Sequence, residues 1–110
     1  MKRMYELVAI FDPTAENEIR EERIKALEKI LEEKTTLSKP KEVWGRRKLA
    51  YPIKKKNEGI YILWTFEAEP TVIDIINNHI FYEELIIRKL IVVVDKKHSI
   101  NKKETETKET

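Results

Sequence analysis

The side chains that most often carry out catalysis or hold metal ions are few in this 110-residue chain, and they are scattered. The chain has no cysteine, so disulfides and thiolate-ligated metals are excluded. Neither histidine, His79 or His98, has a metal ligand or a catalytic base at motif spacing. Glu83 and Glu84 are adjacent, and neighbouring residues of a helix or loop do not face each other. The sequence therefore indicates a protein that is not an enzyme, with no cofactor, no metal and no small-molecule substrate.

The residues with the clearest chemical meaning form a basic segment in the middle of the chain. Residues 39–56 contain eight lysines and arginines and one acid, between segments 12–34 and 57–95 that are both net acidic. Guanidinium and ammonium groups bind phosphate oxygens, so this block indicates a surface that faces a polyanion such as nucleic acid. The alternative is that the lysines only solubilise an edge strand and its turn. With two glycines in all, the chain has no glycine-rich loop that would hold phosphate instead.

Cations and apolar residues interleave within this basic segment. Successive side chains of a strand point to opposite faces, so the segment would carry basic groups on both. The residues expected on one face are Arg47, Leu49, Tyr51 and Ile53, and those expected on the other are Arg46, Lys48 and Ala50.

Hydrophobic spacing predicts six secondary-structure elements and a tail. Strands are indicated by alternation of apolar and polar residues, and helices by apolar residues three and four positions apart. The expected strands are 3–11, 42–53, 60–68 and 86–95, and the expected helices are 15–34 and 70–80. The segments between them include a polar connection at 35–41 and a hairpin turn at 54–59.

The start of the first helix has two candidate caps. Asp12 can act as the N-cap with Pro13 at the first helical position, or Thr14 can act as the N-cap further along. Both residue types accept hydrogen bonds from the first helical N–H groups, and the sequence leaves the two alternatives open.

The order of elements predicts an α+β fold of the ferredoxin-like split βαβ sandwich type (βαββαβ). Right-handed crossovers and a central hairpin give a four-stranded antiparallel sheet with two helices on one face. The other face of the sheet is then expected to be open. It would carry Val8, Ile10, Tyr61 or Leu63. Such a face could contact a protein partner or RNA bases, and the alternative is a solvated surface that is only mildly apolar.

The chain is expected to divide into one domain and one tail. Residues 1–95 would form an RNA- and partner-binding domain, and residues 96–110, rich in Lys, Glu and Thr, a charged disordered tail. No apolar stretch is long enough to span a membrane and no apolar signal core is present, so no membrane association is expected.

One stretch carries a family resemblance. The run from Trp44 to Lys55, Trp-Gly-Arg-Arg-Lys-Leu-Ala-Tyr-Pro-Ile-Lys-Lys, resembles the signature of the bacterial small-subunit ribosomal protein S-six (S6) family. The further stretches that agree are Tyr5-Glu6, Gly59-Ile60-Tyr61, Glu69-Pro70 and Arg88-Lys89-Leu90, so the resemblance covers residues 1–95. Lys48 stands where the family more often has arginine, which keeps the charge but loses the bidentate geometry.

The resemblance implies a structural constituent of the small ribosomal subunit, located in the cytoplasm and without catalytic activity. It implies binding to the central domain of 16S ribosomal RNA together with ribosomal protein S-eighteen (S18), as a heterodimer. The candidate RNA- or partner-binding residues are first Arg46, Arg47 and Lys48, and then Lys2, Arg3, Lys54, Lys55, Lys56, Arg88 and Lys89.

Two other functions fit a ferredoxin-like fold. A regulatory or small-ligand-binding module would need a pocket with convergent polar groups, and it leaves the basic run unexplained. A module that binds single-stranded RNA on its sheet would need exposed aromatics on the central strands, for which Tyr61 is a candidate. Trp44 and Trp64 are expected to pack in the core or against a partner rather than stack on bases.

Overall fold

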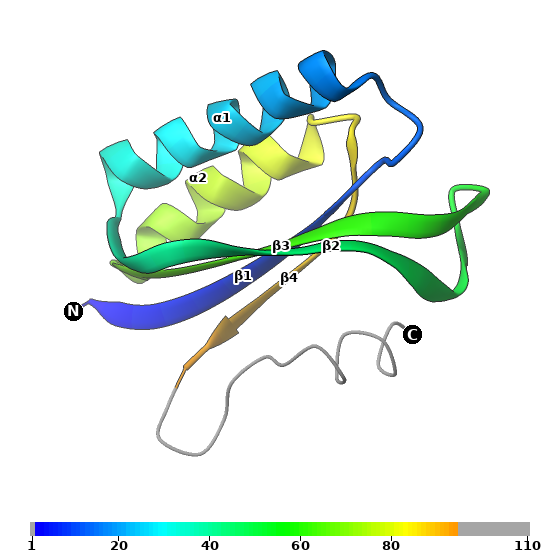
Figure 1. Cartoon of the computed structure of the whole chain (residues 1–110). Helices are drawn as coiled ribbons and strands as arrows, with labels where there is room; N and C mark the ends of the chain where they lie inside the picture. Colours follow the sequence, from blue (N-terminus) through cyan, green and yellow to red (C-terminus); the bar gives the residue numbers. More distant parts are fainter. Residues whose placement is uncertain (1, 95–110) are drawn as a thin grey trace.

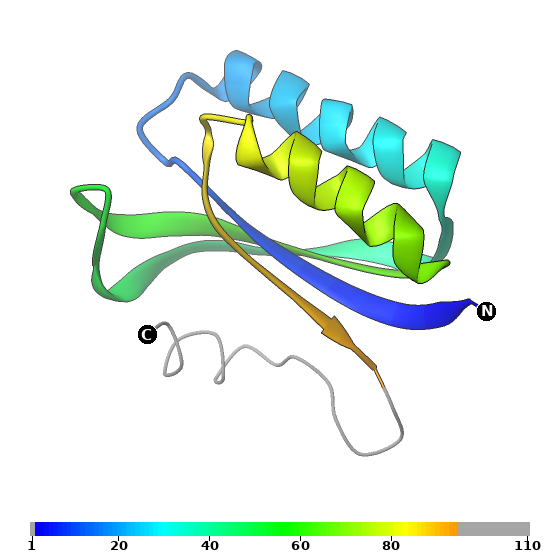
Figure 2. The same cartoon turned by 180° about the vertical axis from the view of Figure 1, so that it is seen from behind.

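The computed structural model describes residues 2–94 and arranges them as one sheet covered on one face by two helices (Figures 1 and 2). The elements are β1 (Arg3–Phe11), α1 (Asn17–Lys34), β2 (Thr36–Ile53), β3 (Lys56–Ala68), α2 (Pro70–Phe81) and β4 (Ile86–Val93). The strand order is β2-β3-β1-β4 and every pairing is antiparallel, which confirms the predicted ferredoxin-like fold. The tail predicted at 96–110 lies outside the described residues.

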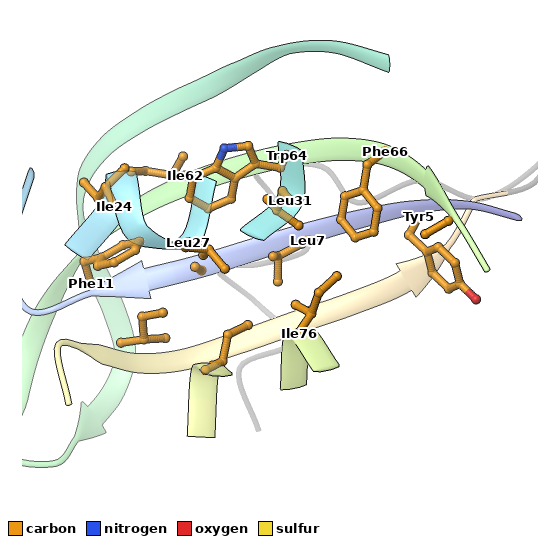
Figure 3. Close-up of a cluster of buried hydrophobic side chains, with 14 residues drawn as sticks. Tyr5, Leu7, Phe11, Ile24, Leu27, Leu31, Ile62, Trp64, Phe66 and Ile76 are labelled. Carbon is orange, nitrogen blue, oxygen red and sulfur yellow. The ribbon is translucent and has the colours of Figure 1, made fainter. Parts of the chain in front are cut away.

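The main core lies between the sheet and the helices (Figure 3). The alternation predicted for the first strand is confirmed, because Leu7 and Phe11 point into this core from β1. Trp64 and Phe66 of β3 are buried beside them, and Leu27 is buried from α1. Each fully buried side chain of this size stabilises the fold by roughly 1.5–3 kcal/mol, so this layer supplies most of the apolar stabilisation.

The opposite face of the sheet is not open, which contradicts the expectation. The four residues that it was expected to expose, Val8, Ile10, Tyr61 and Leu63, are all buried. They belong to a second apolar cluster that also contains Leu49 of β2 and Ile87 of β4, with Trp44, Ile53 and Val92 packed against it. The interleaved apolar residues of the basic segment therefore cover part of this face, a role that the alternation alone did not reveal.

Strand β2 starts earlier than predicted. The residues read as a polar connection, 35–41, are mostly strand, because β2 begins at Thr36. Their register against β3 shifts between Leu37 and Lys39 and again between Lys39 and Glu42. Pro40 is tolerated there because β2 is an edge strand, where a missing backbone N–H breaks no central ladder.

Neither predicted cap begins the first helix. Helix α1 begins at Asn17, after an N-cap residue, Glu16, that makes no side-chain capping bond. Asp12 instead closes a turn within the β1–α1 loop, where its Oδ1 accepts hydrogen bonds from the Thr14 backbone N–H at 2.8 Å and the Thr14 hydroxyl at 2.7 Å. Local side-chain to backbone bonds of this kind compete with helix capping, and here the turn prevails.

Candidate nucleic-acid interface

The basic segment lies on a hairpin that extends past the end of the sheet. Strand β1 pairs with β3 only from Ile60 to Ala68, so the residues before Ile60 have β2 as their only strand neighbour. We call residues 46–59 the basic hairpin, and it is the green ribbon that projects at one end of the molecule in both views (Figures 1 and 2). It carries six lysines and arginines against one acid, Glu58. A two-stranded ribbon is only marginally stable alone, so its contacts with the rest of the molecule decide how rigid it is.

The turn of the basic hairpin consists of Lys54 and Lys55. Ile53 pairs directly with Lys56, which leaves a two-residue loop. Both lysines have positive φ angles, 50° for Lys54 and 66° for Lys55. A two-residue turn of this kind favours Asn-Gly, because the left-handed region costs residues with a Cβ roughly 1–2 kcal/mol each. The fold thus holds two exposed lysines in an unfavourable backbone conformation at the tip of the projecting hairpin (Figure 1).

Arg46 and Lys48 lie on the side of the ribbon that faces the β1–α1 loop. The Arg46 Nη1 is 3.2 Å from Oε1 of Glu58 on the other strand, and its Nη2 donates to the Pro13 carbonyl at 3.3 Å. Lys48 is paired in register with Glu58 and is exposed. Arg46 is therefore held in place but still largely exposed, so it can present its guanidinium to an anion from a fixed position.

Arg47 lies on the other side of the ribbon, over the second apolar cluster. Its guanidinium carbon is 5.7 Å from the centre of the Trp44 ring, within the range of a cation–π contact. The Trp44 ring in turn stacks on Tyr61, with centroids 6.3 Å apart and an interplanar angle of 18°. Gly45, at φ +83°, forms the register shift that turns Trp44 onto this face. The predicted split of the basic residues between two faces is confirmed.

Both tryptophans have packing roles, as predicted. Trp64 is buried in the main core, and its Nε1 donates to Oε2 of Glu28 at 3.2 Å (Figure 3). Trp44 is half-buried over the second cluster. Tyr61 is fully buried, so it cannot offer its ring to a base on the sheet surface.

Lys56 anchors the basic hairpin instead of extending from it. Its ammonium lies 3.5 Å from Oδ2 of Asp12 and donates to the Thr14 hydroxyl at 3.0 Å. Burial raises the pKa of Asp12, but the hydrogen bonds from Thr14 and the charge of Lys56 outweigh it, so the pKa lies below its usual value of 3.8. The Asp12 carboxylate is thus the joint between the hairpin and the β1–α1 loop.

Gly59 makes a second anchor through close approach. A Cβ at this position would lie 2.2 Å from Cγ2 of Ile10 and 3.7 Å from Cδ1 of Ile87. The backbone of β3 therefore rests directly on the second apolar cluster at the base of the hairpin. Glycine is needed here for space.

The structure brings together only part of the predicted basic set. Lys2 and Arg3 lie at the opposite end of the sheet, since Arg3 pairs with Ala68 about 26 Å along the strand from the hairpin base. Arg88 pairs with Ile10 and lies in the same row across the sheet as Gly45. The next residue of β4 points to the helical side, where the Lys89 Nζ donates to Oδ1 of Asn77 at 2.6 Å.

Sequence reasoning did not single out two exposed aromatics at the end of α2. Phe81 is 79% exposed and Tyr82 is 73% exposed, and their rings meet edge to face with centroids 5.0 Å apart. The available signal was periodicity, because the buried residues of α2, Ile76 and Ile80, define an apolar stripe that neither aromatic continues. Large apolar rings off the buried stripe indicate a surface function.

The acidic residues considered for catalysis do not form a pair. Oε2 of Glu83 accepts a hydrogen bond from the Leu85 backbone N–H at 3.0 Å, and its Oε1 is 3.5 Å from Nη1 of Arg23, while Glu84 is exposed. Within residues 2–94, no group of three or more His, Cys, Asp and Glu side chains is placed to hold a metal ion. No helix in the same range is long and apolar enough to cross a membrane.

Three kinds of comparison agree on one family. The family model described as ribosomal protein S6 matches residues 4–93. The small ribosomal subunit protein bS6 of Fusobacterium nucleatum is 37% identical over 93 residues, covering 84% of this chain and 99% of the relative, and that of Paenarthrobacter aurescens is 40% identical over 91 residues, covering 82% and 89%. The crystal structure of 30S ribosomal protein S6 from Thermotoga maritima is similar with a TM-score of 0.79 and 32% identity, covering 86% of this chain and 89% of that one.

Proposed function

This chain belongs to the ribosomal protein S6 family and is a structural constituent of the small ribosomal subunit, and we propose that it binds the central domain of 16S ribosomal RNA there, together with ribosomal protein S18. The family places the protein in the ribosome, which in bacteria lies in the cytoplasm. The relatives are named as ribosomal proteins and not as enzymes, so the expectation of a non-catalytic protein is confirmed.

The observation that carries the RNA proposal is the turn of the basic hairpin. Two lysines occupy left-handed positions at which Asn and Gly would be more stable, and both are exposed at the tip of the projecting hairpin (Figure 1). Unfavourable backbone conformations persist where function requires them. A pair of ammonium groups held there fits contact with the phosphate backbone of RNA, which dominates affinity.

The proposed contact residues follow from the geometry. Lys48, Lys54 and Lys55 are exposed and form no ion pair within residues 2–94, so they carry the phosphate contacts. Arg46 adds a positioned guanidinium. Arg47 and Lys56 support the ribbon from within, through Trp44 and Asp12.

The remaining basic candidates are expected to make different contacts, because they lie in different parts of the sheet. Lys2 and Arg3, at the far end of the sheet, would contact S18 or a separate segment of RNA, since they cannot share a phosphate cluster with the hairpin. Arg88 and Lys89 would extend the surface across the end of β4. We retain residues 1–95 as the binding domain and residues 96–110 as a charged tail.

The single-stranded-RNA module loses its main support, because the ring of Tyr61 is buried beneath Trp44. A regulatory module remains without an explanation for the lysine turn. We therefore propose no second function.

The test replaces Lys54 and Lys55 while improving the turn. Lys54→Asn/Lys55→Gly removes two charges and supplies the residues that the turn favours. We expect binding to a 16S central-domain RNA fragment, measured by filter binding with S18 present, to weaken. The slope of log K against log salt should fall by about 1 for each phosphate that the variant no longer binds.

The matched control is Lys25→Gln/Lys29→Gln on the exposed side of α1. It removes the same charge far from the basic hairpin and keeps good helix formers. If both double variants lower the affinity and the salt slope equally, only net charge matters, and the proposal of a hairpin contact is wrong. Omitting S18 tests the partner: wild-type affinity that does not change without S18 would contradict joint binding.

A further inference from the structure

Phe81, one of the exposed aromatic pair at the end of α2, borders a cavity whose lining combines cations and apolar residues. The cavity has a volume of about 460 Å³, within the range of roughly 300–1,000 Å³ typical of ligand sites. Its lining includes the cations Lys54, Arg88 and Lys89, together with Asn77, Glu84, Phe81 and the isoleucines Ile80, Ile86 and Ile87. The hairpin turn thus borders the same cavity as the end of α2 and the start of β4, although the turn is distant from both in the sequence.

The charge around this cavity is net positive. Lys54, Arg88 and Lys89 contribute three positive charges. Glu83 also borders the cavity, but its carboxylate is bound to the Leu85 N–H and paired with Arg23. Glu84 therefore remains as the exposed acid among the lining residues.

Of the two exposed rings, Phe81 is the one that shares a cavity with these cations. It borders the cavity, whereas Tyr82 lines a separate depression with Ile19, Arg23 and Leu85. The two rings meet edge to face at 88°, with centroids 5.0 Å apart. An aromatic side chain has only two rotatable bonds, so it needs little ordering when a flat ligand stacks on it.

We propose that Phe81 stacks on an unpaired base of the bound RNA, while Lys54 and Lys89 contact the phosphates that flank that base. Tyr82 acts as a positioning residue that fixes the Phe81 ring. This inference rests on the proposed function and adds to it a base-contacting site outside the basic hairpin. Stacking on aromatic rings together with cation–phosphate contacts is the usual way that proteins bind single-stranded RNA.

Charge favours RNA over a protein as the occupant. The centres of protein–protein interfaces are depleted of lysine and glutamate, and their aromatics are surrounded by apolar residues. Phe81 borders a cavity that combines the isoleucines Ile80, Ile86 and Ile87 with the cations Lys54, Arg88 and Lys89, and the cations distinguish it from such a centre. Lys89 uses one of its three N–H donors on Asn77, so the others can reach a phosphate.

The test compares Phe81→Leu with Phe81→Trp in the full chain. Leucine keeps an apolar side chain but has no π face, whereas tryptophan keeps the platform. With S18 and the 16S central-domain fragment, we expect Phe81→Leu to weaken binding roughly 5- to 150-fold and Phe81→Trp to bind as the wild type does. The salt slope of Phe81→Leu should not change, because every phosphate is still bound, while Lys54→Ala/Lys89→Ala should lower it.

Three further measurements make the result decisive. Ile75→Ala removes another exposed apolar residue of α2 and should not affect RNA binding. Tyr82→Leu should weaken binding in the wild type but have no added effect in Phe81→Leu, as expected of a positioning residue. Because Phe81 is exposed, Phe81→Leu should leave the melting temperature unchanged.

The outcomes separate this inference from the proposed function. If the wild type binds the RNA and Phe81→Leu binds it with the same affinity, the stacking site is overturned and the proposed function stands. An absence of RNA binding by the wild type with S18 would overturn both. A loss of S18 affinity in Phe81→Leu, measured by calorimetry without RNA, would show a protein-binding face and overturn the RNA assignment.

Discussion

The register of β1 against β3 runs from Arg3 opposite Ala68 to Phe11 opposite Ile60 without a break, whereas β2 shifts register against β3 at four points. The residues of β1 are nearly all buried, while those of β2 are nearly all exposed or half-buried. The regular half of the sheet, formed by β1 and β3, supplies most of the buried apolar side chains and therefore stability. The irregular half, β2, still pairs with β3 from Thr36 to Ile53, but its register shifts allow it to place arginine, lysine and tryptophan side chains on its surface.

The largest effect should come from the regular half. Trp64→Ala removes a fully buried ring from the main core and its hydrogen bond to Glu28. We expect a loss of about 3–5 kcal/mol in the free energy of unfolding, because a cavity remains where the ring was. Urea denaturation followed by circular dichroism measures it. A loss below about 1 kcal/mol would mean that the core reorganises and that the contrast between the two halves is overstated.

The anchor at Gly59 should come next. Gly59→Ala places a methyl group 2.2 Å from Cγ2 of Ile10, so the hairpin base must move. We expect a loss of about 1–3 kcal/mol, the usual effect of overpacking. Gly45→Ala is the comparison, because a Cβ there meets nothing within 4 Å and only the positive φ is unfavourable. If Gly45→Ala is the more damaging change, backbone conformation and not close packing controls the hairpin.

The lysine turn should respond in the opposite direction. Lys54→Asn/Lys55→Gly relieves two left-handed residues and should raise the free energy of unfolding by about 1–2 kcal/mol. Thermal unfolding of the free protein measures this gain. A gain in stability together with weaker RNA binding would show that the irregular half gives up stability for function. A loss in stability would indicate that the lysines themselves support the turn.

The smallest effect concerns the joint at Asp12. Because the pKa of Asp12 is lowered in the folded state, its carboxylate stabilises the fold above its ordinary pKa of 3.8. That contribution is lost as pH falls through the lowered value. Asp12→Asn should destabilise the protein by about 1 kcal/mol at neutral pH and flatten the decline in acid. If the stabilities of variant and wild type fall in parallel between about pH 5 and pH 2, the Asp12 carboxylate does not stabilise the fold through its charge.

The sequence predicted the regular half better than the irregular half, and burial explains why. The bounds of β1 are as predicted, because apolar residues on both faces make a strong pattern. The start of β2 was missed, since exposed residues such as Lys39 and Lys41 carry no burial pattern. The helix cap was wrong because Asp12 accepts hydrogen bonds from Thr14 in a turn and also pairs with Lys56, a residue distant in sequence.

The candidate site was predicted only in part for the same reason. Composition identified the basic run, and alternation divided Arg46 from Arg47 correctly. It could not separate Lys56, which is an anchor, from Lys55, which is exposed, because both are lysines of one turn. Phe81 was missed, since its relation to Lys54 exists only in the folded protein, where both residues border one cavity.

The strand order β2-β3-β1-β4 also has a consequence during synthesis of the chain. Strand β1 can pair with β3 once Ala68 has been made, but its other edge has no partner until β4 is complete at Val93. At about 5–20 residues per second, this leaves β1, the strand with the largest share of buried residues, with an open hydrogen-bonding edge for roughly one to five seconds. Newly made chains that are still attached to a translating ribosome can thus associate through this edge. The risk ends when β4 pairs with β1.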